Sequence, residues 1–178
     1  MKTTYFLFLG LVLTLSACGP TLSPFTQSLY EDSRFSANEL KQIQFYLSDD
    51  LILERQVSGN LSEVIEGEIR MVDGRKVEQI TFRAGTPGVF VFSPKENRLA
   101  ISFEDGDDRF LVFGPNPRVG NRYVLLASDW QNRYGFVSYA GKQWRVGAQD
   151  AYTTLMVDLE RMSRTEVNNR VAGGRRIE

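Results

Sequence analysis

Short stretches in which apolar and polar residues alternate run through most of the chain. In the first of them, Ile65, Ile69 and Met71 alternate with Glu66, Glu68 and Arg70. Alternation with a period of two places the apolar side chains on one face of a β-strand. The same pattern, or a short β-prone apolar run, predicts strands at 65–71, 76–83, 89–93, 99–103, 110–113, 123–127, 134–139, 143–146 and 152–159.

Turn signals separate these predicted strands. Asp73-Gly74 is a strong two-residue hairpin signal, and Ala140-Gly141 closes the hairpin between two later strands. Short strands at this regular spacing predict a mainly β domain, in which an antiparallel meander closes into a small barrel or a sandwich. A helix over 151–162 is the alternative for the last segment. The Thr153-Thr154 pair and the absence of helix caps favour a strand there.

One short helix is expected near the amino terminus. Ser36 and Glu39 have the spacing of a capping box, in which each residue's side chain accepts a hydrogen bond from the other's backbone N–H. Leu40, Ile43 and Tyr46 follow at helical spacing, which predicts a helix from Ala37 to Tyr46.

The first residues have the composition of an export signal. Lys2 is followed by an apolar run from Tyr5 to Leu15. A positive start followed by an apolar run of this length is typical of a signal peptide. The run is too short for a membrane-spanning helix, which needs about 20 apolar residues.

The run ends in Leu15-Ser16-Ala17-Cys18, which resembles the lipobox of bacterial lipoproteins. The resemblance covers residues 1–18 alone. It implies a diacylglyceryl group on the Cys18 thiol, cleavage before Cys18 and acylation of the new amine. Gly19 follows where an aspartate would favour the inner membrane, so the resemblance implies an outer-membrane anchor facing the periplasm. An ordinary secretory signal with a coincidental cysteine is the alternative.

These features predict a division of the chain into four parts. Residues 1–17 are a signal peptide, 18–28 are the lipidated cysteine and a tether, 29–162 form a single β-rich domain, and 163–178 form a polar tail. Cys18 is the only cysteine, so the mature domain has no disulfide in an oxidising compartment and its stability comes from core packing.

Charge and composition exclude several classes of function. The chain has 21 Lys and Arg against 22 Asp and Glu, so no basic excess favours nucleic acid as a partner. It has no histidine, which excludes catalytic triads that contain histidine and the commonest zinc sites. No phosphate-binding or dinucleotide-binding motif occurs, so no cofactor is expected and the chain is predicted not to be an enzyme.

Two sequence features could mark a binding site. Trp130 stands among polar residues in a predicted loop with Arg133 nearby, and an exposed tryptophan beside an arginine is a common partner-binding anchor. The alternative is that Trp130 folds back over the core.

The second feature is an acidic loop around Gly106. Its carboxylates offer oxygen ligands for Ca²⁺ and belong to Glu104, Asp105, Asp107 and Asp108. Their spacing is not that of an EF-hand loop. The alternative is a solvated hairpin loop.

Together these observations predict a membrane-anchored envelope lipoprotein that acts as a non-enzymatic binding or structural accessory subunit through contacts with another envelope protein. One alternative is a carrier that holds a small apolar ligand inside a β-barrel. Another is a hydrolase that uses two carboxylates, for which the candidates are Glu66, Glu68, Asp129 and Asp158.

Overall fold

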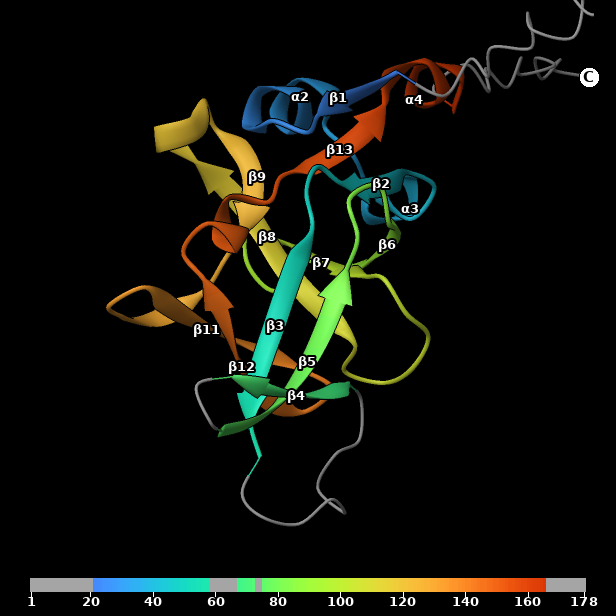
Figure 1. Ribbon diagram of the computed structural model, residues 1–178. Coiled ribbons are helices and arrows are strands. Elements are labelled where there is room, and N and C mark those ends of the chain that lie inside the picture. Colours follow the sequence, from blue (N-terminus) through green and yellow to red (C-terminus); the bar gives the residue numbers. More distant parts are fainter. Residues whose placement is uncertain (1–20, 58–66, 73–74, 166–178) are drawn as a thin grey trace, which may run out of the picture.

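Strands account for most of the regular structure, in two antiparallel sheets (Figure 1). The computed structural model describes residues 21–57, 67–72 and 75–165. The predicted signal peptide, Cys18, Glu66, the Asp73-Gly74 turn and most of the predicted tail lie outside the described residues. Within them, the prediction of a mainly β protein is confirmed.

The larger sheet has seven strands. Their order is β1 (Leu22–Pro24), β13 (Leu155–Asp158), β2 (Gln44–Leu47), β6 (Pro87–Phe92), β7 (Leu99–Ser102), β8 (Phe110–Asn116) and β9 (Arg122–Leu125). In this sheet β6 to β9 follow one another as a meander, whereas β13, the last strand of the described residues, inserts between β1 and β2.

The smaller sheet has six strands. Their order is β10 (Ser128–Gln131), β11 (Tyr134–Tyr139), β12 (Lys142–Gly147), β3 (Leu51–Gln56), β5 (Arg75–Phe82) and β4 (Glu68–Val72). The short helices are α2 (Gln27–Ser33), α3 (Ala37–Leu40), α4 (Leu159–Thr165), η3 (Pro117–Val119) and η4 (Asp150–Tyr152).

The two sheets share one apolar core. On the smaller sheet, Leu51 and Leu53 of β3 lie opposite Phe82 and Ile80 of β5, and all four side chains are buried. The larger sheet contributes side chains such as Phe113 of β8, which has no exposed surface. This core replaces the disulfides that a single cysteine cannot supply.

The ends of the larger sheet approach each other without forming a continuous ladder. Isolated bridges join Thr26 to Arg122 and Val124 to Thr154. The part of the predicted fold that the structure supports is therefore two antiparallel sheets around a shared core, and the small barrel is not confirmed.

The predicted tether is wrong for the residues that the structure describes. Leu22–Pro24 form β1, which pairs with β13, and the side chain of Phe25 is fully buried. Thr26 then caps α2 by accepting a hydrogen bond from the Leu29 N–H at 3.2 Å. Residues that the sequence suggested were a linker thus belong to the folded domain, because Phe25 packs into the core.

The predicted helix from Ala37 to Tyr46 is too long. The capping box is confirmed, since the Ser36 hydroxyl accepts from the Glu39 N–H and the Ser36 N–H donates to Glu39 Oε2 at 2.7 Å. The helix nevertheless ends at Leu40, and Gln44–Leu47 form β2. Phe45 and Leu47 alternate with Gln44 and Tyr46, and this period of two lets β2 pair with β13 and β6.

The predicted long strand from Tyr152 to Leu159 is only partly correct. Tyr152 belongs to η4, and the strand spans Leu155–Asp158. Asp158 then ends it, because its Oδ1 accepts hydrogen bonds from the backbone N–H groups of Glu160 and Arg161 at 3.0 and 3.2 Å and so begins α4. A single helix over 151–162 is also wrong.

The smaller sheet contains a buried ion pair. Arg55 of β3 lies opposite Glu78 of β5 and forms an ion pair with it, and Glu78 has no exposed surface. The Gly67 N–H donates to Glu78 Oε1 at 2.9 Å, and the Arg55 guanidinium lies 5.5 Å from the ring centre of Trp144. These contacts offset the cost of taking both charges out of water.

Removing one charge of this pair is expected to destabilise the domain strongly. Glu78→Gln removes the fully buried carboxylate that pairs with Arg55, so the free energy of unfolding is expected to fall by about 3–5 kcal/mol in urea denaturation. The double variant Arg55→Met, Glu78→Leu removes both charges and is expected to recover much of that loss. A Glu78→Gln protein as stable as the wild type would contradict this account of the pair.

Candidate functional site

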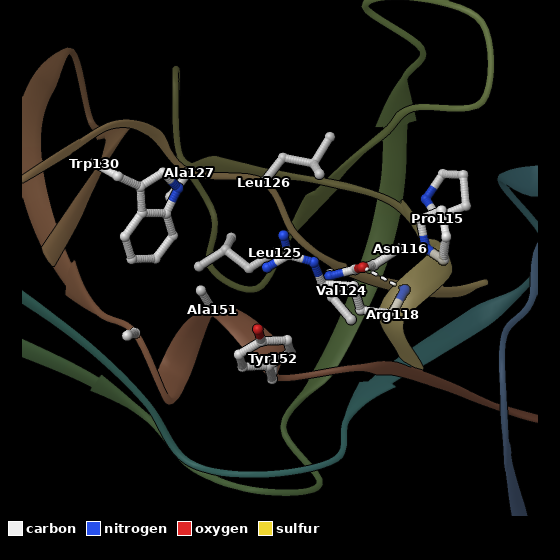
Figure 2. A pocket seen from close by; sticks show the side chains of 12 residues that line it. Pro115, Asn116, Arg118, Val124, Leu125, Leu126, Ala127, Trp130, Ala151 and Tyr152 are labelled. Carbon is white, nitrogen blue, oxygen red and sulfur yellow. Dashed lines mark hydrogen bonds between the residues drawn. The ribbon is translucent and has the colours of Figure 1, made fainter. Parts of the chain in front are cut away.

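A cleft of about 480 Å³ opens where the edge of the larger sheet meets β10 of the smaller one (Figure 2). Its aromatic lining consists of Trp130 from β10 and Tyr152 from η4, with exposed fractions of 48% and 46%. Leu125 and Ala151 lie between these two rings, and Asn116 lies at the end away from Trp130, from which the Arg118 side chain extends toward Leu125 (Figure 2). The cleft therefore has an aromatic end and a polar end.

The polar end is built by the tight connection between β8 and β9. Pro117 begins η3, where its fixed φ is suited to the first helical position. Asn116 Oδ1 accepts a hydrogen bond from the Arg118 N–H at 3.0 Å, and Gly120 ends the turn at a φ of 71°. This turn holds the backbone of Arg118 beside the cleft.

The aromatic end depends on a glycine in β11. A Cβ added to Gly135 would lie 2.7 Å from the Ala127 side chain and 3.0 Å from the Trp130 ring. The absence of a side chain at Gly135 thus lets Trp130 lie against β11. Trp130 packs on its own sheet and still leaves about half of its surface exposed to the cleft.

The short helix η4 brings Tyr152 to the cleft. The Tyr152 N–H donates to the Gln149 carbonyl and the Thr153 N–H to the Asp150 carbonyl, both at 3.0 Å. The following residues Thr153 and Thr154 are buried, which anchors the segment under the ring.

Burial raises the pKa of Asp150 above its ordinary value of 3.8, and the nearby Glu54 carboxylate adds to the increase. A hydrogen bond from the Gly147 N–H acts in the opposite direction without cancelling the shift. Ionisation of Asp150 in the folded protein therefore lowers the free energy of unfolding.

The structure separates the two residues predicted as a partner-binding pair. Trp130 lines the cleft, although it belongs to edge strand β10 and not to a loop. Arg133 lies in the turn between β10 and β11, and its carbonyl accepts the Ala148 N–H at 2.8 Å. Arg133 is exposed and does not line the cleft, where Arg118 supplies the guanidinium.

The predicted Ca²⁺ ligands do not converge. Glu104 Oε2 accepts a hydrogen bond from the Tyr139 hydroxyl at 2.6 Å and lies 3.6 Å from Arg109 Nη1. The Asp108 carbonyl accepts the Ala140 N–H at 2.9 Å. No three acidic or metal-binding side chains among residues 21–57, 67–72 and 75–165 are grouped so that they could hold a metal ion. The loop is instead joined to the hairpin of β11 and β12.

The described carboxylates proposed for hydrolysis lie on separate elements. Glu68 is on β4 at one edge of the smaller sheet and pairs with Arg70, whereas Asp129 is on β10 at the other edge. Asp158 is on β13 of the larger sheet and caps α4. The structure therefore brings none of these three together as a catalytic pair.

Arg118 and Tyr152 are site residues that the sequence does not single out. Arg118 follows a Pro-rich turn and Tyr152 lies in a predicted strand, so neither carries a local signal of binding. Their proximity depends on bridges between β9 and distant segments, such as the one from Val124 to Thr154.

Comparisons with protein-family models, curated proteins and solved structures found no significant match to this chain. Among the described residues, no helix is both long enough and apolar enough to cross a membrane.

The raised pKa of Asp150 predicts a pH-dependent effect on stability. The folded state binds this proton more tightly than the unfolded state, so ionisation of Asp150 lowers stability as the pH rises above 3.8 and through the native pKa. Asp150→Asn keeps an oxygen that can accept the Gly147 N–H. We expect the variant to be more stable than the wild type at pH 7.

The measurement is urea denaturation of both proteins between pH 3 and pH 8. The difference in stability is expected to shrink toward zero as the pH falls below the ordinary value of 3.8, where both side chains are neutral. A difference in stability that is independent of pH, or a wild type that is the more stable protein at pH 7, would contradict a raised pKa of Asp150 in the folded state.

Proposed function

We propose that this chain is a lipid-anchored envelope protein without enzymatic activity, which binds a partner protein through the cleft between Trp130 and Tyr152. The anchor rests on the lipobox at Cys18. The cleft carries the binding proposal, because it presents two half-exposed aromatic rings above an apolar floor beside the edge of a sheet. Exposed aromatic residues around a pocket are the commonest energetic centres of protein interfaces.

The chemistry of the cleft indicates the kind of group it accepts. Leu125 and Ala151 form an apolar floor suited to an aliphatic or aromatic side chain of the partner. The Arg118 side chain, which extends from the polar end toward Leu125, is suited to a carboxylate or a backbone carbonyl. The residues that line the cleft include no carboxylate and no cysteine, so a binding role fits them better than acid–base or nucleophilic catalysis.

The alternative of an internal ligand carrier has less support. Large side chains fill the space between the sheets, and Trp144, Tyr139, Tyr123 and Phe113 have no exposed surface. A carrier would need this volume for its ligand. The carboxylate hydrolase also has less support, because the described candidate acids are far apart in the fold.

Photo-cross-linking in intact cell envelopes tests the binding proposal. A photoreactive residue replaces Gln131, next to Trp130, and the cross-linked species are compared with and without Trp130→Ala and Tyr152→Ala. Each substitution is expected to weaken binding, and with it the specific species, by roughly 30-fold or more, because truncation of a central aromatic anchor costs at least about 2 kcal/mol.

Met71→Ala provides the matched control. Met71 is 65% exposed on β4, at the opposite edge of the smaller sheet from β10. This substitution is expected to leave the cross-linked species unchanged. If the species persists in the Trp130→Ala, Tyr152→Ala double variant, the cleft is not the binding site.

A further inference from the structure

The described part of the domain lies very close in the chain to the predicted lipid. Leu22 is only four residues from Cys18, and an extended chain covers at most about 3.6 Å per residue. The backbone of Leu22 therefore lies within roughly 14 Å of the Cys18 backbone. If Cys18 carries lipid, the end of the domain that contains β1 must lie at the membrane surface. An eleven-residue tether would have imposed no such orientation.

The surface at this end is formed by residues that flank β1 and β9. Thr26 bridges to Arg122, and the Gln27 N–H donates to the Asn121 carbonyl at 3.0 Å. A recess of about 610 Å³ lies here. Its lining is Pro24, Thr26, Arg118, Val119, Gly120 and Arg122.

Charge distinguishes this recess from an ordinary solvated surface. Arg118 and Arg122 are both exposed, and neither makes an ion pair in the described part of the chain. The lining contains no acidic residue; Glu31 and Asp32 of the adjacent α2 lie outside it. Two guanidinium groups without an ion pair in the described part of the chain, at the end of the domain that contains β1, are suited to phosphate, which arginine binds with two parallel hydrogen bonds.

We propose that the β1 end of the domain rests on the membrane and that Arg118 and Arg122 bind the phosphates of anionic phospholipid headgroups. This inference rests on the lipid anchor of the proposed function and adds an orientation to it. Figure 1 places β1 and α2 at one end of the molecule and β4 at the other, so β4 points away from the bilayer.

The orientation also places the candidate cleft. Arg118 lines both the recess and the polar end of the cleft. A partner bound between Trp130 and Tyr152 would therefore lie beside the membrane surface, within reach of a protein that is itself embedded in the bilayer.

Depth-dependent fluorescence quenching tests the orientation. The lipidated protein is reconstituted into vesicles of phosphatidylglycerol and phosphatidylethanolamine that contain a nitroxide-labelled headgroup lipid. A fluorophore is attached through Val119→Cys in one sample and Met71→Cys in the other, since lipid occupies the native thiol. Strong quenching is expected at 119 and little at 71. Equal quenching at the two positions would overturn the proposal.

The arginines are tested in the same vesicles with Arg118→Gln, Arg122→Gln. Each basic side chain near an anionic surface strengthens binding about fivefold, so the double variant is expected to lower the docking equilibrium, read from quenching at 119, by roughly 25-fold. The control Arg70→Gln, Lys76→Gln removes two exposed positive charges near β4 and is expected to change nothing.

Two further measurements separate the possible failures. Wild-type protein in neutral phosphatidylcholine vesicles is expected to reproduce the loss seen with the double variant without any substitution. Quenching that depends on neither lipid charge nor the arginines would overturn the headgroup assignment while leaving the anchor intact. Intact mass of the protein reports the lipid itself; a protein without lipid mass would refute the anchor and, with it, this orientation.

Discussion

The packing of Phe25 connects the amino-terminal segment to the rest of the domain. Its fully buried ring lies 5.0 Å from the ring of Tyr123 on β9 and 5.3 Å from that of Phe45 on β2, measured between ring centres. The Phe25 N–H donates a hydrogen bond to the Leu155 carbonyl, and the Phe25 carbonyl accepts one from the Tyr123 N–H. Because one residue joins strands from the start, middle and end of the chain, the fold depends on a segment only seven residues beyond Cys18. In our proposal, this short separation couples a lipid on Cys18 to the orientation of the domain.

Alternation in the sequence predicts the strands that pair with their neighbours in the sequence. The hairpin of β11 and β12 follows from Tyr134–Tyr139 and the Ala140-Gly141 turn. The segments that were mispredicted or missed depend on distant partners. Gln44–Leu47 continued a helical spacing and became a strand because β13 and β6 lie on either side of it, and Leu51–Gln56, a central strand, has three apolar residues followed by three polar ones and so lacks the alternation that marks a strand. Such pairing is set by tertiary packing, which a local pattern does not contain.

The candidate site divides in the same way. Trp130 was found from the sequence because a tryptophan among polar residues is unusual at any position. Arg118 and Tyr152 were not, since the cleft is assembled from β8, η3, β10 and η4 and no spacing in the sequence relates them. In the acidic loop the structure favours the alternative to an ion site, because Glu104 contacts Tyr139 and Arg109 and the Asp108 carbonyl accepts the Ala140 N–H.

A lipid on Cys18 is the premise of the proposed envelope location, of the proposed orientation on the membrane and of an envelope protein as the partner. Intact mass and membrane fractionation of the wild-type protein beside Cys18→Ala test it most directly. The account predicts that the wild type gains the mass of its acyl groups and sediments with the outer membrane, and that the variant does neither. A wild-type protein that is soluble and carries no lipid mass would contradict the account and leave a secreted binding protein in its place.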